Sequence, residues 1–245
     1  MSVGVTASPG AKMIYLIRRK ATTSREELVA HWFANHMPLV VARQKAQADL
    51  GKLHASRYIA TLFDPGRDGT HVWDGVAQLW WERPLPRPAV PHGTEPTDSF
   101  QEKAETYVPW ATTEYVVLDG SGHLGVEPLT LNAPFPCTRS GFVKVTFLVT
   151  SQSGIDHGEL FAHWLDVHVP NVKGVMEQVG GFGYVVSHSL EPDVDPHAGM
   201  AELYFPDADS WKDFSRTIRD DGMGRWVDPA ATVVMTAQTE MIGIA

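Results

Sequence analysis

The chain has 245 residues, a formal net charge of −9 at pH 7 and a single cysteine, Cys137. The acidic balance disfavours nucleic acids and anionic membranes as partners, because both bind basic surfaces. One cysteine excludes an intrachain disulfide and fits a reducing compartment, and no segment is apolar for long enough to span a bilayer. Residues 1–11 are small and polar, so we expect a flexible N-terminus, no secretory signal and a cytoplasmic protein.

The first half of the chain predicts alternating strands and helices. Met13–Ile17 is a short apolar run that is typical of a strand. Ser24 and Glu27 have the spacing of a capping box, which predicts the start of a helix, and Pro38 is expected to end that helix. The elements expected after it are strands at 57–62 and 76–81, a helix that begins after Thr97 and a strand at 114–118.

The second half predicts the same order of elements. Val145–Val149 corresponds to the first strand, Asp156 caps the helix that follows, and Pro170 is expected to end it. The elements expected after it are strands at 183–188 and 200–205, a helix that begins after Asp209 and a strand at 233–242.

A direct sequence repeat supports this parallel. Residues 12–40 align without a gap with residues 144–172, and later segments align at slightly shorter shifts. The coinciding residues include uncommon types, namely His31 with His163, Trp32 with Trp164, His36 with His168 and Pro38 with Pro170. We therefore expect two copies of one unit, at residues 12–118 and 141–245. A linker rich in Gly and Pro is expected at 119–140, and surface loops at 64–71 and 84–96.

The element order β-α-β-β-α-β is that of a ferredoxin-like unit, with both helices on one face of an antiparallel sheet. The opposite face is expected to be apolar, so it must be buried. The predicted fold class is therefore α+β, with two ferredoxin-like repeats that form an intramolecular dimeric α/β barrel. Association of this single-chain pseudo-dimer into a further homodimer stays open.

The pattern Trp32, His36, Pro38 after a strand and a capped helix resembles the EthD family of the dimeric α/β-barrel superfamily. The second copy carries the same signature in Trp164, His168 and its following proline. The resemblance implies a small, mostly apolar substrate between sheet and helices, with acid–base chemistry by one or two polar groups. Members include lactone isomerases, polyketide cyclases, dehydratases, cofactor-free monooxygenases and accessory proteins of ether degradation, so fold alone does not fix the function.

His36 and His168 are the candidate catalytic acid–base residues, because histidine exchanges protons near neutral pH. The alternative is a structural histidine that bonds a backbone carbonyl near the proline. Tyr58 and Tyr184 occupy matching strand positions and are candidates to polarise a carbonyl or stabilise an enolate. For them the alternative is a tyrosine at the protein surface.

Further residues are expected to contact the substrate. On an ideal helix Trp32 and Asn35 lie on a stripe with Leu28, while His31 and His36 lie at its two edges. Trp80 and Trp81 are adjacent in a strand, so one should face the helix-side cavity and the other the opposite face of the sheet. The candidate substrate-binding residues are His31, Trp32, Asn35, Trp80, Trp81, His163, Trp164 and His188.

These residues favour an enzyme without a cofactor or a metal, because no cluster of metal ligands and no nucleotide-binding motif is present. We expect a lyase or isomerase, of the dehydratase, decarboxylase or cyclase type, that acts on a small hydrophobic carbonyl or phenolic compound. Two alternatives remain. One is a protein that only binds a hydrophobic metabolite or delivers it to an oxygenase, and the other is an oxygenase with or without haem.

Overall fold

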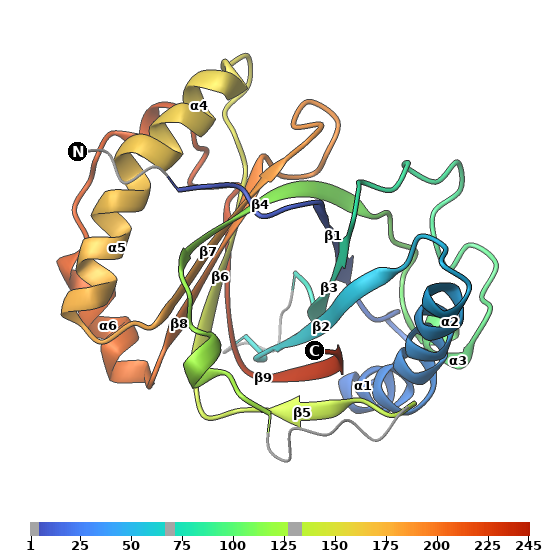
Figure 1. The fold of residues 1–245 in the computed structure, drawn as a ribbon. Coiled ribbons are helices and arrows are strands. Elements are labelled where there is room, and N and C mark those ends of the chain that lie inside the picture. Colours follow the sequence, from blue (N-terminus) through green and yellow to red (C-terminus); the bar gives the residue numbers. More distant parts are fainter. Residues whose placement is uncertain (1–4, 67–71, 127–133) are drawn as a thin grey trace. The chain divides into compact units, whose positions relative to one another are not determined.

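The computed structural model describes residues 5–66, 72–126 and 134–245, which form two compact units (Figure 1). The first unit comprises Pro9–Ala111, Gly125–Ser140 and Thr239–Ala245. The second unit comprises Met1–Ser8, Thr112–Leu124 and Gly141–Gln238. Figure 1 shows α1 and α2 beside the strands of the first unit, and α4, α5 and α6 beside those of the second.

The first half of the chain contains strand β1, a helix interrupted by a π-helical turn, and then β2, β3, α3 and β4. Their bounds are β1 (Ala11–Ile17), α1 (Arg25–His31), η1 (Trp32–His36), α2 (Met37–Asp49), β2 (Ala55–Phe63), β3 (Gly75–Trp81), α3 (Ser99–Lys103) and β4 (Trp110–Leu118). The expected capping box is confirmed, because the Ser24 side chain accepts from the Glu27 backbone N–H and Glu27 reaches back to Ser24.

The second half repeats this order. Its elements are β6 (Val143–Val149), α4 (His157–His163), η3 (Trp164–His168), α5 (Val169–Gln178), β7 (Gly183–Ser189), β8 (Gly199–Phe205), α6 (Ala208–Thr217), the short 3-10 turn η4 (Met223–Arg225) and β9 (Val233–Ile244). Asp156 caps α4 as predicted, by accepting from the backbone N–H groups of Gly158 and Glu159. The helix α6 begins earlier than expected, after Asp207 as its N-cap.

The strand order agrees with the predicted α+β class. Hydrogen-bonded neighbours run β4-β1-β3-β2 in the first half and β9-β6-β8-β7 in the second, which is the ferredoxin-like order. The central pairs are antiparallel with corresponding register, since Ile17 pairs with Gly75 and Val149 pairs with Gly199. Each half therefore places its first strand beside its third, under the interrupted helix.

The last strand of each half is divided between the two units. The residues of β4 from Thr112 onward belong to the second unit, where they pair with β7, and the residues of β9 from Thr239 onward belong to the first unit. The expected linker also contains structure, because it includes the turn η2 (Ser121–His123) and the strand β5 (Cys137–Arg139), which pairs with β9. Parts of the linker and of the loop at 64–71 lie outside the described residues.

The two helix prolines do not end their helices as predicted. Each lies at the start of the α-helical segment that directly follows a π-helical turn, α2 or α5. The five residues before each of these segments, Trp32–His36 and Trp164–His168, form a π-helical turn. The Met37 N–H bonds to Trp32 O in the first turn, and the Val169 N–H bonds to Trp164 O in the second. The wider turn lets the helix continue past the proline without a break.

Each π-helical turn carries a tryptophan that packs directly on a glycine of the third strand. A Cβ atom built on Gly75 would lie 2.9 Å from the Trp32 ring, and one on Gly199 would lie 2.8 Å from the Trp164 ring. Real Cβ atoms are not found so close to other atoms, so only glycine leaves room for the indole at these positions. Both tryptophans are about 1% exposed and belong to the apolar cores.

The sheet faces opposite the helices carry buried polar groups, so the expectation of an apolar face is wrong. In the second unit Lys144 and Glu202 form a buried ion pair at 2.7 Å. In the first unit Glu240 accepts from Arg139 at 2.6 Å and from Thr61 at 3.0 Å. Buried charges persist where partners satisfy them, and here neighbouring strands supply those partners.

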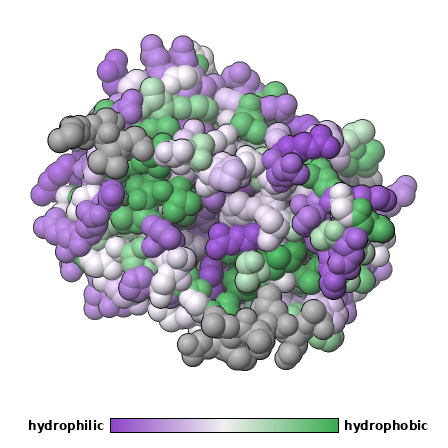
Figure 2. All heavy atoms as spheres, in the orientation of Figure 1, coloured by the Kyte–Doolittle hydropathy of each residue, from purple (hydrophilic) through white to green (hydrophobic). Residues whose placement is uncertain are grey.

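Figure 2 shows hydrophilic side chains interspersed with smaller hydrophobic patches over one face of the molecule, a mixture that is usual on exposed protein surfaces. Within the part of the chain that the structure describes, no helix has the length and apolar character to cross a bilayer.

The contact between tryptophan and glycine predicts a large effect of one added methyl group. In Gly199→Ala the new Cβ meets the Trp164 ring and the backbone oxygen of Ser187, each at 2.8 Å. We expect a loss of about 1–3 kcal/mol in the free energy of unfolding, measured by urea denaturation. Gly174→Ala is the control, because nothing lies within 4 Å of its Cβ and alanine favours the helix. Equal effects of the two variants would contradict this packing.

Candidate functional site

A cavity of about 320 Å³ lies between the helices and the sheet of the first unit. Its walls come from β1, η1, α2, β2, β3 and α3, together with residues of the loops around α3. The lining residues are Tyr15, Ile17, Trp32, His36, Val40, Arg43, Gln44, Tyr58, Ala77, Leu79, Trp81, Leu85, His92, Phe100, Gln101 and Tyr107. The volume is at the lower end of the range for small-molecule sites.

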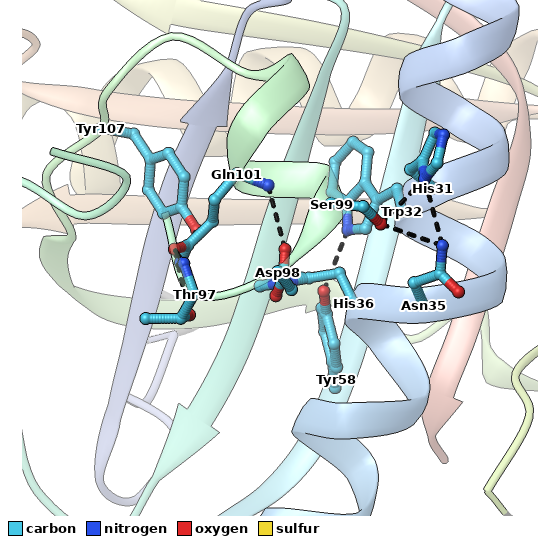
Figure 3. Close-up of polar contacts among 10 residues, drawn as sticks. All are labelled: His31, Trp32, Asn35, His36, Tyr58, Thr97, Asp98, Ser99, Gln101 and Tyr107. Atoms are coloured by element: carbon cyan, nitrogen blue, oxygen red, sulfur yellow. Dashed lines mark hydrogen bonds and ion pairs between the residues drawn. The ribbon is translucent and has the colours of Figure 1, made fainter. Parts of the chain in front are cut away.

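His36 is held at this cavity by a carboxylate. Its Nδ1 lies 2.6 Å from Asp98 Oδ2 (Figure 3). Its ring packs on Phe100 with centroids 4.5 Å apart. Because a carboxylate only accepts, Nδ1 carries the proton of the neutral imidazole and Nε2 is left as the acceptor. Among the residues that the structure describes, Nε2 has no hydrogen-bond partner. The expected alternative, a bond to a backbone carbonyl, is not what the structure shows.

Asp98 is positioned by its own helix. It is the N-cap of α3, where Oδ1 accepts from the backbone N–H of Gln101 at 2.9 Å. Burial alone would raise the pKa of this carboxyl, but the hydrogen bonds from His36 and Gln101 outweigh it and lower the pKa. The carboxylate therefore stays ionised near neutral pH and fixes the orientation of the imidazole.

Tyr58 lies inside the cavity and not at the surface, since it is 1% exposed. Its hydroxyl oxygen accepts from the indole N–H of Trp32 at 3.0 Å (Figure 3). This bond occupies the oxygen but leaves the hydroxyl hydrogen available as a donor. Burial raises the pKa of Tyr58 above its ordinary value, so the group stays protonated near neutral pH.

The opposite wall contains a second group of polar rings. Tyr15 and Tyr107 meet edge to face at 6.1 Å, and His92 lies 5.5 Å from Tyr107. The His92 and Tyr107 backbones exchange two hydrogen bonds, and Gln101 donates to the Tyr107 hydroxyl at 3.4 Å. Burial raises the pKa of Tyr107 to about 12. Burial, and then the charge of His36, lower the pKa of His92.

His31 and Asn35 do not line the cavity, although both were expected at it. His31 Nδ1 lies 2.8 Å from Ser99 Oγ, and Asn35 donates to the same oxygen at 3.0 Å. The prediction assumed 100° per residue, whereas residues of the π-helical turn each advance by less. The turn therefore moves Asn35 towards α3 and His36 towards the cavity.

The paired tryptophans of β3 divide as predicted. Trp81 lines the cavity on the helix side. Trp80 faces the opposite side, where Lys12 lies 5.3 Å and Arg57 lies 5.0 Å from its ring. Trp80 was predicted to contact the substrate, but it lies outside the cavity. The reason is that neighbouring residues of a strand point to opposite faces of the sheet.

The second unit contains a corresponding cavity of about 260 Å³. His168 lines it, and His168 Nδ1 lies 2.8 Å from Asp221 Oδ2, which also accepts from Asn171 at 2.7 Å. Burial would raise the pKa of Asp221, but the bonds from Asn171 and His168 lower it. The remaining lining residues are Phe147, Val149, Trp164, Val172, Tyr184, Ala201, Leu203, Phe214, Ile218, Met223, Val227 and Thr232.

The aromatic pair of this second cavity differs from that of the first. Tyr184 is fully buried, yet neither its hydroxyl nor the indole N–H of Trp164 has a hydrogen-bond partner among the described residues. Burial raises the pKa of Tyr184, and the nearby Trp164 indole offsets this only in part, so the tyrosine stays protonated near neutral pH. The second cavity thus holds two unpartnered polar atoms between largely apolar walls.

His163 and His188 lie outside both cavities. His163 Nε2 lies 3.7 Å from Asp221 Oδ1, and the ring packs on Trp226. His188 stacks on Phe161 at 4.2 Å beside a shallow groove of about 370 Å³ in the second unit, which also involves Leu190. Burial lowers the pKa of His188 to about 3, so it is neutral near physiological pH.

Sequence reasoning missed the two carboxylates. Asp98 had one signal, because its spacing to Gln101 is that of a helix cap and a helix was predicted to begin after Thr97. Asp221 had none, since it follows α6 instead of preceding it. No repeat alignment can therefore match the two carboxylates to each other. Within the described ranges, no group of three or more His, Cys, Asp or Glu side chains is placed to hold a metal ion.

Part of the second half of the chain is similar to a known domain. Residues 152–230, a range that includes Trp164, His168 and Asp221, match the model of the EthD domain. This confirms the resemblance predicted from the second copy of the motif. No curated protein sequence matches the chain.

The chain is also similar to solved structures of low sequence identity. An anthrone oxidase-like protein is 9% identical with a TM-score of 0.53, and the match covers 96% of this chain and 94% of that one. Chlorite dismutase from Candidatus Nitrospira defluvii in complex with imidazole is 9% identical with a TM-score of 0.46, covering 94% and 92%. A heme-binding protein from Thermus thermophilus is 13% identical with a TM-score of 0.41, covering 98% and 94%. The first of these likenesses supports the α+β fold and nothing more specific.

The buried neutral state of His188 predicts acid sensitivity. The pKa of His188 is about 3 in the folded protein, whereas the pKa of a histidine in the unfolded chain is about 6.5. The unfolded chain therefore binds more protons between these values, so the stability that His188 contributes above pH ~6.5 is lost as the pH falls towards 3. His188→Phe keeps a ring on Phe161 without the titration. We expect the free energy of unfolding, measured by urea denaturation, to fall less steeply in the variant as the pH is lowered from 6.5 to 4. The same pH dependence in both proteins would contradict this prediction.

Proposed function

We propose that the first cavity is the active site of an enzyme that moves a proton within a small hydrophobic carbonyl or phenolic compound. The observation that carries this proposal is His36, which is fixed through Nδ1 by Asp98 and presents an unpartnered Nε2 at the cavity. The reaction would be that of a lyase or isomerase of the dehydratase, decarboxylase or cyclase type. His36 is its base and then its acid.

The proton transfer follows from the placement of the groups. Nε2 accepts a proton from a carbon next to the substrate carbonyl, while Asp98 stabilises the imidazolium that forms. The electrons of the broken C–H bond move to the carbonyl oxygen, which accepts a hydrogen bond from the Tyr58 hydroxyl. In an isomerisation the same proton returns to another atom. In a dehydration it leaves with the departing hydroxyl as water.

The walls of the cavity suggest the substrate class. Trp32, Trp81 and Phe100 offer aromatic faces, and Leu79 adds an aliphatic one. Tyr15 and Tyr107 supply further hydroxyls for a substrate with a second polar end. A mono- or bicyclic molecule of this kind suits a cavity of about 320 Å³, and its apolar walls would strengthen the hydrogen bonds inside by excluding water.

The same arrangement would also serve a protein that only binds such a molecule and hands it on. The presence of one such cavity in each unit suits this alternative as well. The two alternatives differ in the role of His36, because an enzyme needs its imidazole as a base and a binding protein does not. Native mass spectrometry of the purified protein would identify a retained ligand, and His36→Ala would keep that ligand under the binding reading.

A haem oxygenase is the remaining alternative. An imidazole bonded through Nδ1 to a carboxylate, as in His36 with Asp98, is a common arrangement for metal ligation. The cavity fits haem less well, because Arg43 is the one Lys or Arg among its described lining residues for two propionates, and the Trp32 and Phe100 rings occupy space beside His36. We therefore derive no step through haem. Titration with hemin followed by the Soret band tests this reading independently of turnover.

Replacement of the histidine in each cavity should show which cavity is catalytic. Deuterium uptake from D₂O into a panel of small ketones and phenols, followed by NMR, detects proton transfer next to a carbonyl. We expect His36→Ala to slow this exchange by about 100- to 10,000-fold, because general base catalysis contributes that much. His168→Ala is the matched control and should leave the exchange nearly unchanged. Equal losses in both variants would refute a single working site.

Asp98 is expected to act as a positioning residue. Asp98→Asn keeps the shape and the cap of α3 but offers an amide that can donate to Nδ1, so the tautomer with the proton on Nε2 becomes available. We expect kcat to fall by at least about 100-fold with little change in KM. Asn171→Ala, which removes a contact to the other carboxylate, is the control. If Asp98 had a purely structural role, Asp98→Asn would lower thermal stability but would not lower kcat selectively at a nearly constant KM.

A further inference from the structure

The second cavity contains two buried donors that nothing in the described structure satisfies. Tyr184 is 0% exposed and Trp164 is 1% exposed, and neither the hydroxyl nor the indole N–H has a hydrogen-bond partner among the described residues. The indole lies close enough to lower the pKa of Tyr184 slightly against the effect of burial, but without the geometry of a hydrogen bond. Both side chains line the cavity. In the first unit the matching pair, Trp32 and Tyr58, is bonded at 3.0 Å, so the unpartnered state is specific to the second cavity.

Buried polar groups in proteins are almost always hydrogen-bonded, because leaving them without a partner is unfavourable. An indole N–H can only donate, and the Tyr184 hydroxyl has its hydrogen to give as well. An occupant that relieves both groups must therefore offer an acceptor atom. A hydrocarbon would fill the space but would leave both donors without a partner.

The remaining walls limit the rest of the occupant. Phe147, Leu203, Phe214 and Met223 are apolar, so most of the bound surface must be apolar as well. The charge of Asp221 is already met by His168 and Asn171, and an anion near it would be repelled. The described lining residues include no Asp, Glu, Lys or Arg, so a charged occupant of either sign would be buried without an ion-pair partner. The occupant is therefore uncharged and small enough for about 260 Å³.

We propose that the second cavity is a binding site for a small, uncharged, mostly apolar molecule that is held through one acceptor oxygen, such as a ketone or ester carbonyl, by Tyr184 and Trp164. The site does not depend on the chemistry proposed for His36. The two cavities would hold a carbonyl oxygen differently, because the Trp32 indole already donates to Tyr58 in the first, whereas Trp164 and Tyr184 are both available as donors in the second.

A matched pair of ligands tests the acceptor directly. 2-Acetylnaphthalene and 2-ethylnaphthalene have similar shape, and only the ketone carries an oxygen. We expect calorimetric titration to show tighter binding of the ketone to the full chain, and Tyr184→Phe to weaken that binding by about tenfold without affecting the hydrocarbon. If the two ligands bind equally, or if Tyr58→Phe instead of Tyr184→Phe weakens the ketone, the inference is wrong.

An indole signal provides a readout that does not rely on affinity. The indole N–H resonance of Trp164 is assigned by its loss in Trp164→Phe. Hydrogen bonding to the ketone should move this resonance downfield, whereas the hydrocarbon should not. A ketone that binds while the Trp164 resonance stays in place would overturn the proposed contact.

The unoccupied protein offers a further test through stability. Tyr184→Phe removes a hydroxyl without a partner, so we expect an unchanged or higher Tm. Tyr58→Phe removes the acceptor of the Trp32 indole and should lower Tm. If Tyr184→Phe lowers Tm as much as Tyr58→Phe does, the Tyr184 hydroxyl has a partner and the basis of the inference is lost.

Discussion

The wide helical turn at Trp32–His36 is the constraint on which the first site depends. The proline two residues later lacks an N–H, and the π-helical bond from Met37 to Trp32 lets the helix continue past it. The same turn keeps the tryptophan and the histidine on one side, where the indole enters the space over Gly75. A regular α-helix would place His36 at the edge of the stripe that faces the sheet and Asn35 near the middle of that stripe. One local irregularity thus positions the core residue and the base together.

The two halves share this turn but differ in what surrounds it. In the first half Asp98 reaches His36 from the N-cap of α3, whereas in the second Asp221 reaches His168 from the segment after α6. Two unrelated loops thus supply the same carboxylate contact, which indicates that an oriented imidazole is the requirement at both places. The loops also set the character of each cavity, since they add tyrosine and histidine in one and aliphatic side chains in the other.

Much of the first site could be predicted, because its parts lie on elements with strong local signals. His36 and Tyr58 were found from the repeat, and both line the cavity. His31 and Asn35 were misplaced because a π-helical turn has no clear signature in a single sequence. Asp98 was missed because its distance in sequence from His36 is bridged only when α3 packs against the interrupted helix.

The sequence by itself determined the order of strands and helices, the capped helix starts and the repeated motif of tryptophan, histidine and proline, because these depend on contacts within a few residues. Only the tertiary structure decided which carboxylate meets each histidine and which face of each sheet is polar. It also decided whether a tyrosine is paired, as Tyr58 is with Trp32 and Tyr184 is not with Trp164. These features depend on side chains brought together from distant segments, where a small shift makes or breaks a hydrogen bond.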